Sequence, residues 1–237
     1  MRRVETTRGS VSVAVEVPRT ARPTAPVVVV AHGAGSDMAH PSVVAVCEGI
    51  RAAGYPTVRF NFPYREAGRR APDRQPVLLE CFRAVLATVR TDERMRQRPL
   101  VIGGRSMGGR MASILVADGE AADGLLLLAF PLHAPKRAGT ERAAHLARVG
   151  IPMLFVQGTR DALATWSLIE LLVSALPGAT LHPIPDGDHG FRVPKRRASA
   201  DAVLTDVVST VTGWLATLGR DPQPPGSDTT PGDMLRS

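Results

Sequence analysis

The sequence predicts an α/β fold with a mostly parallel β-sheet and helices on both faces. Short apolar runs rich in β-branched residues, of which Ala25–Ala31 is the clearest, recur along the 237-residue chain. Such continuous runs suit strands that are buried on both faces. Most of them precede a segment whose apolar residues lie three or four positions apart, which is the spacing of one helix face. Strands that alternate with helices in this way form parallel sheets.

The first half of the chain contains three predicted strands and two predicted helices. Residues Ser10–Val17 alternate apolar and polar, as expected of a half-buried strand. Gly54 closes the first helix, because glycine readily adopts the backbone conformation that ends helices. In order, these elements are strands 10–17 and 25–31, helix 42–54, strand 55–64 and helix 75–90. The second helix has one apolar stripe, formed by Leu78, Cys81, Phe82, Val85, Leu86 and Val89.

The second half repeats this pattern. Strands 99–104, 123–130, 151–158 and 179–184 are joined by helices 107–117, 140–149 and 166–176, and helix 200–218 comes last. The interval between Phe130 and Pro152 has room for one helix but not for a lid domain, so we expect an open crevice. We expect one domain over residues 1–220 and a disordered tail over residues 221–237, which are polar and rich in Pro and Gly. The last helix has an apolar face made of Ala200, Val203, Leu204, Val207, Val208, Val211, Leu215 and Leu218.

Composition and charge limit the classes of binding partner that the sequence predicts. The formal net charge is +7, but the basic residues are dispersed and aromatic residues make up only 4% of the chain, so we expect no nucleic-acid partner. No segment reaches the length of a membrane span, and the N-terminus lacks the apolar core of a signal peptide, which predicts a cytoplasmic protein without a membrane partner. Cys47 and Cys81 lie in helical segments and are predicted to be reduced core residues. The sequence leaves the oligomeric state open.

The stretch Ile102–Arg110, "IGGRSMGGR", is the first candidate for chemistry. It contains the pattern G-x-S-x-G from Gly104 to Gly108, between a predicted strand and a predicted helix. A nucleophilic serine in this context lies on a sharp turn, and glycines remove the side chains that would collide across it. The alternative is a glycine-rich loop with an incidental serine. The strand–turn–helix context favours Ser106 as a nucleophile.

A nucleophilic serine requires a base, which a carboxylate in turn orients. Because parallel sheets bind ligands at the carboxyl ends of their strands, the residues that follow each strand are the candidates. His189 follows the last strand and is the preferred base, with His133 as its rival. Asp161 follows the preceding strand and is the preferred acid, whereas Asp186 and Asp188 are expected to shape the turn before His189.

The chain resembles an α/β-hydrolase from about Val11 to Leu218. Its sequence motifs are most similar to those of the dienelactone-hydrolase-like branch, which includes testis-expressed protein thirty and the third subunit of the NSL complex. The segments that carry the resemblance are "HGAGSDMAHP", "RFNFPYRE", "GGRSMGGRMAS", "PLHAP", "QGTRDAL" and "DGDHGF". True dienelactone hydrolases use a cysteine nucleophile, whereas this chain has Ser106, so their substrate does not transfer.

The resemblance implies an α/β-hydrolase fold, here without a lid domain because of the short interval between Phe130 and Pro152, and an oxyanion hole made by two backbone N–H groups. These would be the N–H of Met107 and that of Ala34 in the loop "HGAG", where His32 would hold the loop by hydrogen bonding. No cofactor and no metal ion are implied. His133 is a candidate substrate contact or a loop histidine, and Arg65, Arg69, Arg70 and Arg74 either attract an anionic substrate or form a solvated loop.

These observations favour a serine hydrolase that cleaves a small-molecule ester or thioester. Ser106 would attack the acyl carbon, His189 would take and return the proton, and Asp161 would orient the imidazole. The alternative is a non-catalytic interaction module of the same fold, because fold alone does not imply function. The sequence does not separate ester cleavage from thioester or amide cleavage or from acyl transfer, and it does not identify the acyl or leaving group.

Overall fold

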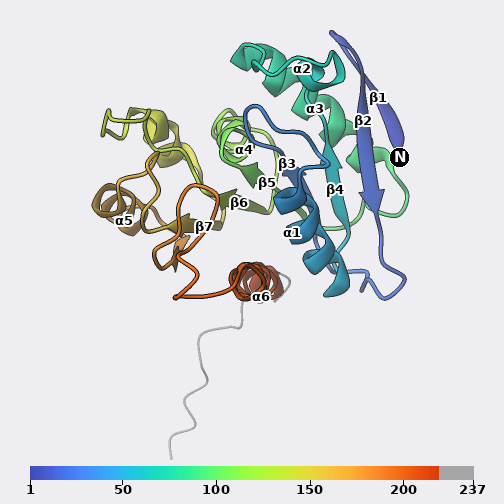
Figure 1. The fold of residues 1–237 in the computed structure, drawn as a ribbon. Coiled ribbons are helices and arrows are strands. Elements are labelled where there is room, and N and C mark those ends of the chain that lie inside the picture. The colour runs from blue at the N-terminus through green and yellow to red at the C-terminus, as the bar shows by residue number, and fades with distance from the viewer. Residues whose placement is uncertain (219–237) are drawn as a thin grey trace, which may run out of the picture.

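The computed structural model describes residues 1–218, which form one eight-stranded sheet covered by helices on both faces (Figure 1). The strand order is β1-β2-β4-β3-β5-β6-β7-β8, and the strands from β4 to β8 in this order run parallel. The pairs β1–β2 and β2–β4 are antiparallel. This arrangement confirms the predicted fold class. The strands are β1 Arg2–Thr6, β2 Gly9–Glu16, β3 Val27–Ala31, β4 Thr57–Phe60, β5 Leu100–Arg105, β6 Gly124–Leu128, β7 Met153–Gly158 and β8 Ala179–Ile184.

The helices divide between the two faces of the sheet. On one face, α1 and α6 pack on Val28, Val30 and Leu128, and on the other face α3, α4 and α5 pack on Val29 and their neighbours (Figure 1). The two separate apolar clusters follow from the alternation of side chains along each strand. The helical elements are α1 Pro41–Ala52, α2 Pro63–Glu66, α3 Gln75–Thr91, α4 Met107–Ala117, the 3₁₀ helix η1 Glu141–Arg148, α5 Trp166–Ser174 and α6 Ala200–Leu218.

Three local features differ from the sequence prediction. The N-terminal strand β1 is absent from that prediction; it pairs with β2, and only Val4 among its residues is buried. The predicted strand 55–64 ends at Phe60, because Pro63 begins the short helix α2. The segment predicted as helix 140–149 is a 3₁₀ helix. The predicted disordered tail, residues 221–237, lies outside the described residues.

The topology brings the candidate residues to one edge of the sheet. Parallel strands present their carboxyl ends together, and the residues that follow β3, β5, β7 and β8 therefore meet there. These positions hold the loop His32–Gly35, Ser106, Asp161 and His189. Among residues 1–218, no helix is long and apolar enough to cross a membrane. Cys47 and Cys81 are free and buried.

Candidate active site

Ser106 lies on a strained turn between β5 and α4. Its φ of 52° and ψ of −115° are rare for a residue with a side chain. Glycines make this turn possible: a Cβ atom on Gly104 or Gly108 would overlap the carbonyl oxygen of Ala31 at the end of β3. Strain of this kind persists only where the surroundings enforce it, and it concentrates at functional sites.

A continuous chain of hydrogen bonds joins Ser106 to two side chains that are distant in sequence. The Oγ atom of Ser106 lies 2.9 Å from Nε2 of His189, and Nδ1 of His189 lies 2.8 Å from Oδ2 of Asp161. The side chain of Asp161 is fully buried, whereas 26% of the His189 side chain is exposed. When Nδ1 carries the ring proton and donates a hydrogen bond to the carboxylate, Nε2 is free to accept the hydroxyl proton of Ser106.

The carboxylate of Asp161 is fixed by two further donors. Gln157, inside β7 and fully buried, donates from Nε2 to Oδ2 at 2.6 Å, and the backbone N–H of Leu163 donates to Oδ1 at 2.7 Å. Together with His189, these groups satisfy both oxygen atoms of a carboxylate that has no access to water. A buried charge with this many donors is compensated rather than isolated.

The main chain of His189 has its own anchor. Nη2 of Arg105, the residue before Ser106, donates to the carbonyl oxygen of His189 at 2.9 Å. Burial lowers the pKa of Arg105, and the nearby carboxylates of Asp161 and Asp188 oppose that effect. The side chain that precedes the candidate nucleophile therefore holds the backbone of the candidate base.

The loop after β3 lies beside Ser106 and has a fixed peptide orientation. A Cβ atom on Gly33 would lie 3.6 Å from Cβ of Ser106. The carbonyl oxygen of Gly33 accepts from Nδ1 of His32 at 2.8 Å and from the hydroxyl of Tyr64 at 3.3 Å. Because a trans peptide points its N–H opposite to its C=O, these two bonds also fix the direction of the Ala34 N–H.

His32 and Tyr64 are held in the protonation states that this arrangement requires. Burial lowers the pKa of His32 to about 4, so its ring is neutral near pH 7, and Nε2 accepts from the N–H of Phe62 at 3.2 Å. Burial raises the pKa of Tyr64 to about 12, so its hydroxyl remains a donor. No hydrogen bond within residues 1–218 uses the N–H of Ala34 or of Met107. Both groups are thus available to an acceptor from outside the chain.

His133, the rival base, does not join this hydrogen-bond chain. Its Nδ1 donates to the carbonyl oxygen of Ala134 at 2.9 Å, and its Nε2 accepts from the backbone N–H of Thr165 at 2.9 Å. Nε2 therefore attaches this loop to the start of α5, and Nδ1 is occupied within the loop itself. Its role as a substrate contact stays a prediction.

The two aspartates before His189 shape its loop. Asp186 has a φ of 58° and pairs with Arg197, and Asp188 accepts from the N–H groups of Gly190 and Arg192. Neither forms a hydrogen bond with the ring of His189 within the described part of the chain.

A second serine–histidine pair lies away from the strand ends. Oγ of Ser113, inside α4, is 2.7 Å from Nε2 of His145 in η1. Ser113 is fully buried, and no described carboxylate is hydrogen-bonded to His145. Burial also lowers the pKa of His145 to about 4. This pair joins η1 to α4, but it lacks both the exposure and the orienting acid that a nucleophile requires.

Two features of the described elements bear on access to Ser106. The interval between β6 and β7 contains only η1 and its loops among the described elements, without an inserted lid domain. In the arginine-rich loop, Arg65 pairs with Asp37 at 3.0 Å and Arg69 pairs with Asp73 at 2.6 Å. Two of the four arginines that could attract an anionic substrate are therefore paired within the protein.

A serine on a strained strand-to-helix turn, with a histidine and an aspartate at later strand ends, defines the α/β-hydrolase class. The family model described as "Alpha/beta hydrolase domain" matches residues 24–216, and the chain belongs to this family. An alpha-beta serine hydrolase homologue from Coxiella burnetii has a TM-score of 0.73 at 19% identity over 90% of this chain and 96% of that chain.

Two other solved structures have the same fold. An α/β serine hydrolase without lid from Xanthomonas campestris has a TM-score of 0.68 at 23% identity, over 90% of this chain and 93% of that chain. Dienelactone hydrolase from Anabaena variabilis has a TM-score of 0.70 at 19% identity, over 91% and 95% of the two chains. At these identities the similarity is evidence for the fold alone.

Sequence reasoning missed three residues that support the site. Gln157 could have been noticed as a polar residue inside the apolar run of β7, four positions before Asp161. Arg105 occupies a variable position of the serine motif, and Tyr64 lies in a segment for which the sequence predicts a strand. The partners of both residues are remote in sequence, so no local pattern identifies them.

Proposed function

We propose that this protein is a serine hydrolase that cleaves a carboxylic ester or thioester through an acyl-enzyme intermediate. The observation that carries the proposal is the hydrogen-bond chain from Ser106 through His189 to Asp161, with distances of 2.9 and 2.8 Å. We assign Ser106 as the nucleophile, His189 as the general base and acid, and Asp161 as the residue that orients the imidazole and stabilises the imidazolium.

The proposed reaction has two halves. Oγ of Ser106 attacks the acyl carbon while Nε2 of His189 takes its proton, and His189 then delivers that proton to the leaving alcohol or thiol as the acyl–oxygen or acyl–sulfur bond breaks. A water molecule, deprotonated by His189, then attacks the acyl carbon; the bond from the acyl carbon to Oγ breaks, and His189 returns the proton to Oγ, which releases the carboxylic acid product and free Ser106. In both halves the N–H groups of Ala34 and Met107 would donate to the oxyanion.

The resemblance to the dienelactone-hydrolase-like branch supports the proposal but not a dienelactone substrate. Ser106 stands where that activity uses a cysteine. The proposed substrate is a small-molecule ester or thioester, and the lack of an inserted lid domain between β6 and β7 among the described elements agrees with it. A non-catalytic module would not require an imidazole that is hydrogen-bonded both to a strained serine and to a buried aspartate.

The test combines active-site labelling with turnover. The wild-type protein should react with a fluorophosphonate probe and hydrolyse p-nitrophenyl esters or acyl-CoA thioesters of graded chain length. Ser106→Ala should abolish both signals, whereas Ser113→Ala, which removes the other histidine-bonded serine, should retain them. Labelling that survives Ser106→Ala would refute the assignment, and failure of the wild-type protein with every probe would favour the interaction module.

A further inference from the structure

A cavity of about 830 Å³ lies on the face of the sheet that α1 and α6 cover, next to the loop that follows His189. Its floor includes Val30 and Leu128, at the carboxyl ends of β3 and β6, and α1 and α6 form its sides. Arg105 and Gly190, the neighbours of Ser106 and His189, line it, but Ser106 and His189 do not. Its volume is in the range of small-molecule sites, which is about 300–1,000 Å³.

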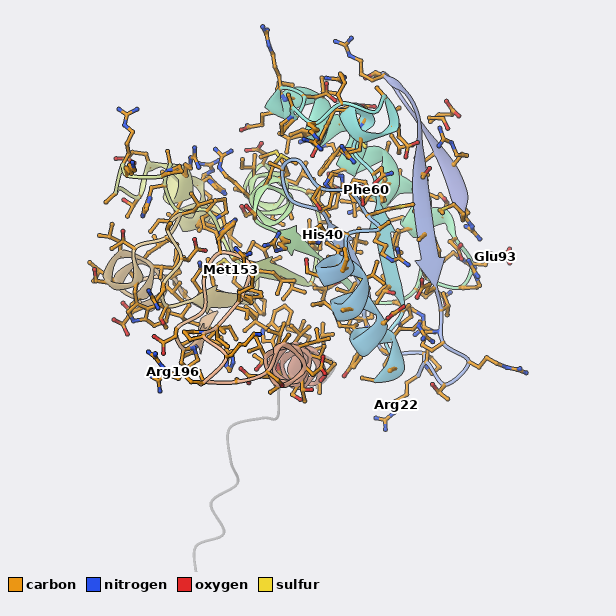
Figure 2. All side chains as sticks on the ribbon, in the orientation of Figure 1. Arg22, His40, Phe60, Glu93, Met153 and Arg196 are labelled. Atoms are coloured by element: carbon orange, nitrogen blue, oxygen red, sulfur yellow. The ribbon has the colours of Figure 1, made fainter. Side chains whose placement is uncertain are left out.

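The cavity exists because α1 and α6 diverge toward their N-termini. The two helices touch at Gly49, where an added Cβ atom would lie 2.8 Å from Cγ1 of Val208. The cavity is lined by the N-terminal parts of the same helices, Pro41–Val46 and Ala200–Val207. Figure 2 marks these ends with His40, at the start of α1, and Arg196, on the segment that leads into α6. The space is therefore wedge-shaped and narrows toward Gly49.

The walls are apolar, and the charged lining is mainly positive. Apolar side chains of α1 and α6, such as Val46 and Val203, form the two sides. The charged lining residues are Arg105, Arg192 and Lys195, against one acid, Asp201. Arg192 is neutralised by Asp188 at 2.9 Å, whereas Lys195 has no ion-pair partner within residues 1–218. An occupant that matches this lining is apolar along its length and carries one negative charge.

Arg105 offers that charge a specific partner. Arg105 lines the cavity; its Nη2 is bonded to the carbonyl oxygen of His189, whereas its Nη1 takes part in no hydrogen bond within residues 1–218, and no described carboxylate forms an ion pair with it. A half-buried guanidinium with an accessible N–H group pairs most favourably with a carboxylate, because a charge-assisted hydrogen bond is stronger than a neutral one. The N-termini of the two flanking helices are already capped by His40 and Ser199, so the charged donors that remain are Arg105 and the exposed Lys195, of which Arg105 is the more buried.

We infer that this cavity binds a carboxylate with an unbranched alkyl chain, with the carboxylate on Arg105 and the chain between α1 and α6. The site is separate from the proposed ester site, because Ser106 and His189 do not line the cavity. Binding does not require Ser106 to be a nucleophile, so it can be measured in the Ser106→Ala protein.

Binding of dodecanoate to the Ser106→Ala protein, measured by isothermal titration calorimetry, tests the inference. We expect one binding site, and we expect dodecyltrimethylammonium, which has the same chain and the opposite charge, to bind at least tenfold more weakly. Ala45→Trp, which fills the cavity from α1, should abolish binding. Ala52→Trp, the same change at an exposed position of the same helix, should leave it intact.

A second pair of measurements isolates the charge. Arg105→Met should weaken dodecanoate binding about tenfold to a hundredfold, the effect of losing a charge-assisted hydrogen bond, while leaving dodecanol binding unchanged. If Ala45→Trp fails to fold, Leu204→Trp fills the same cavity from α6. The inference is overturned if both filled variants bind dodecanoate like the parent, if the cationic and anionic chains bind equally, or if dodecanoate does not bind.

Discussion

Two helical glycines should respond in opposite ways to the same substitution. Alanine is favoured over glycine inside a helix by about 1 kcal/mol, so propensity alone would stabilise either variant. At Gly213, in α6, an added Cβ meets no atom within 4 Å. At Gly108, in α4, it would lie 2.6 Å from the carbonyl carbon of Ala31 and 2.7 Å from the carbonyl oxygen of His32.

The magnitude follows from which atoms would have to move. The neighbours of Gly108 are backbone atoms at the end of β3, which cannot rotate away, so Gly108→Ala should cost the upper part of the overpacking range, about 2–3 kcal/mol. Gly213→Ala should gain about 0.5–1 kcal/mol. The two variants should then differ by about 3 kcal/mol, or about 6–12 °C in Tm for a domain of this size.

Urea unfolding and thermal melts of the two variants measure this difference. Gly108→Ala should also lower kcat, because the displaced Ala31–His32 backbone leads directly into the loop that contains Ala34. Gly213→Ala should leave kcat unchanged, because α6 packs on the face of the sheet opposite to α4 and the strained turn. Equal stability of the two variants would refute the view that the glycine is kept for close approach of α4 to β3.

Three further predictions concern the residues around Ser106. Asp161→Asn should lower kcat by about 10⁴-fold with little change in KM, because the imidazole loses its orienting acceptor; a loss below tenfold would remove Asp161 from the mechanism. Tyr64→Phe should lower kcat about fivefold to tenfold by releasing one hydrogen bond to Gly33, whereas Tyr55→Phe, the matched control, should not. Because the pKa of His32 is about 4 in the folded state and 6.5 for an unperturbed, solvated histidine, the unfolded state binds the extra proton, so stability falls as the pH drops from 6.5 to 4. Urea unfolding should show a loss of about 3 kcal/mol for His32 alone, to which His145 adds; an unchanged unfolding free energy between pH 7 and pH 4.5 would contradict it.

The sequence predicts the parallel core of this fold well, because its strands are buried on both faces and leave continuous apolar runs. Strand β1 leaves no such signal: it is an edge strand in which Val4 alone is buried, and the rest of its residues are charged or polar. The 3₁₀ geometry of η1 is equally hidden, since apolar residues spaced three apart fit either helix type.

The candidate site likewise contains residues that the sequence predicts and residues that it does not. Ser106, Asp161 and His189 each follow a strand that the sequence predicts, so the topology alone places them at one edge of the sheet. The order of strands does not predict the side chains that orient these three residues. Gln157, Arg105 and Tyr64 act through hydrogen bonds whose partners are fixed only when strands from different parts of the chain become neighbours.

The position of His189, the proposed base, relative to the sheet explains why these supporting contacts are required. His189 follows β8, an edge strand that pairs only with β7 and is the least buried of the parallel strands. A loop after such a strand has few neighbours to hold it. The ring of His189 is held by Asp161, which follows β7, and its carbonyl oxygen is held by Arg105, at the end of β5. The imidazole is thereby positioned by groups that belong to or follow two interior strands, one of which leads directly into Ser106, so the distance between the proposed base and the proposed nucleophile does not depend on the edge strand alone.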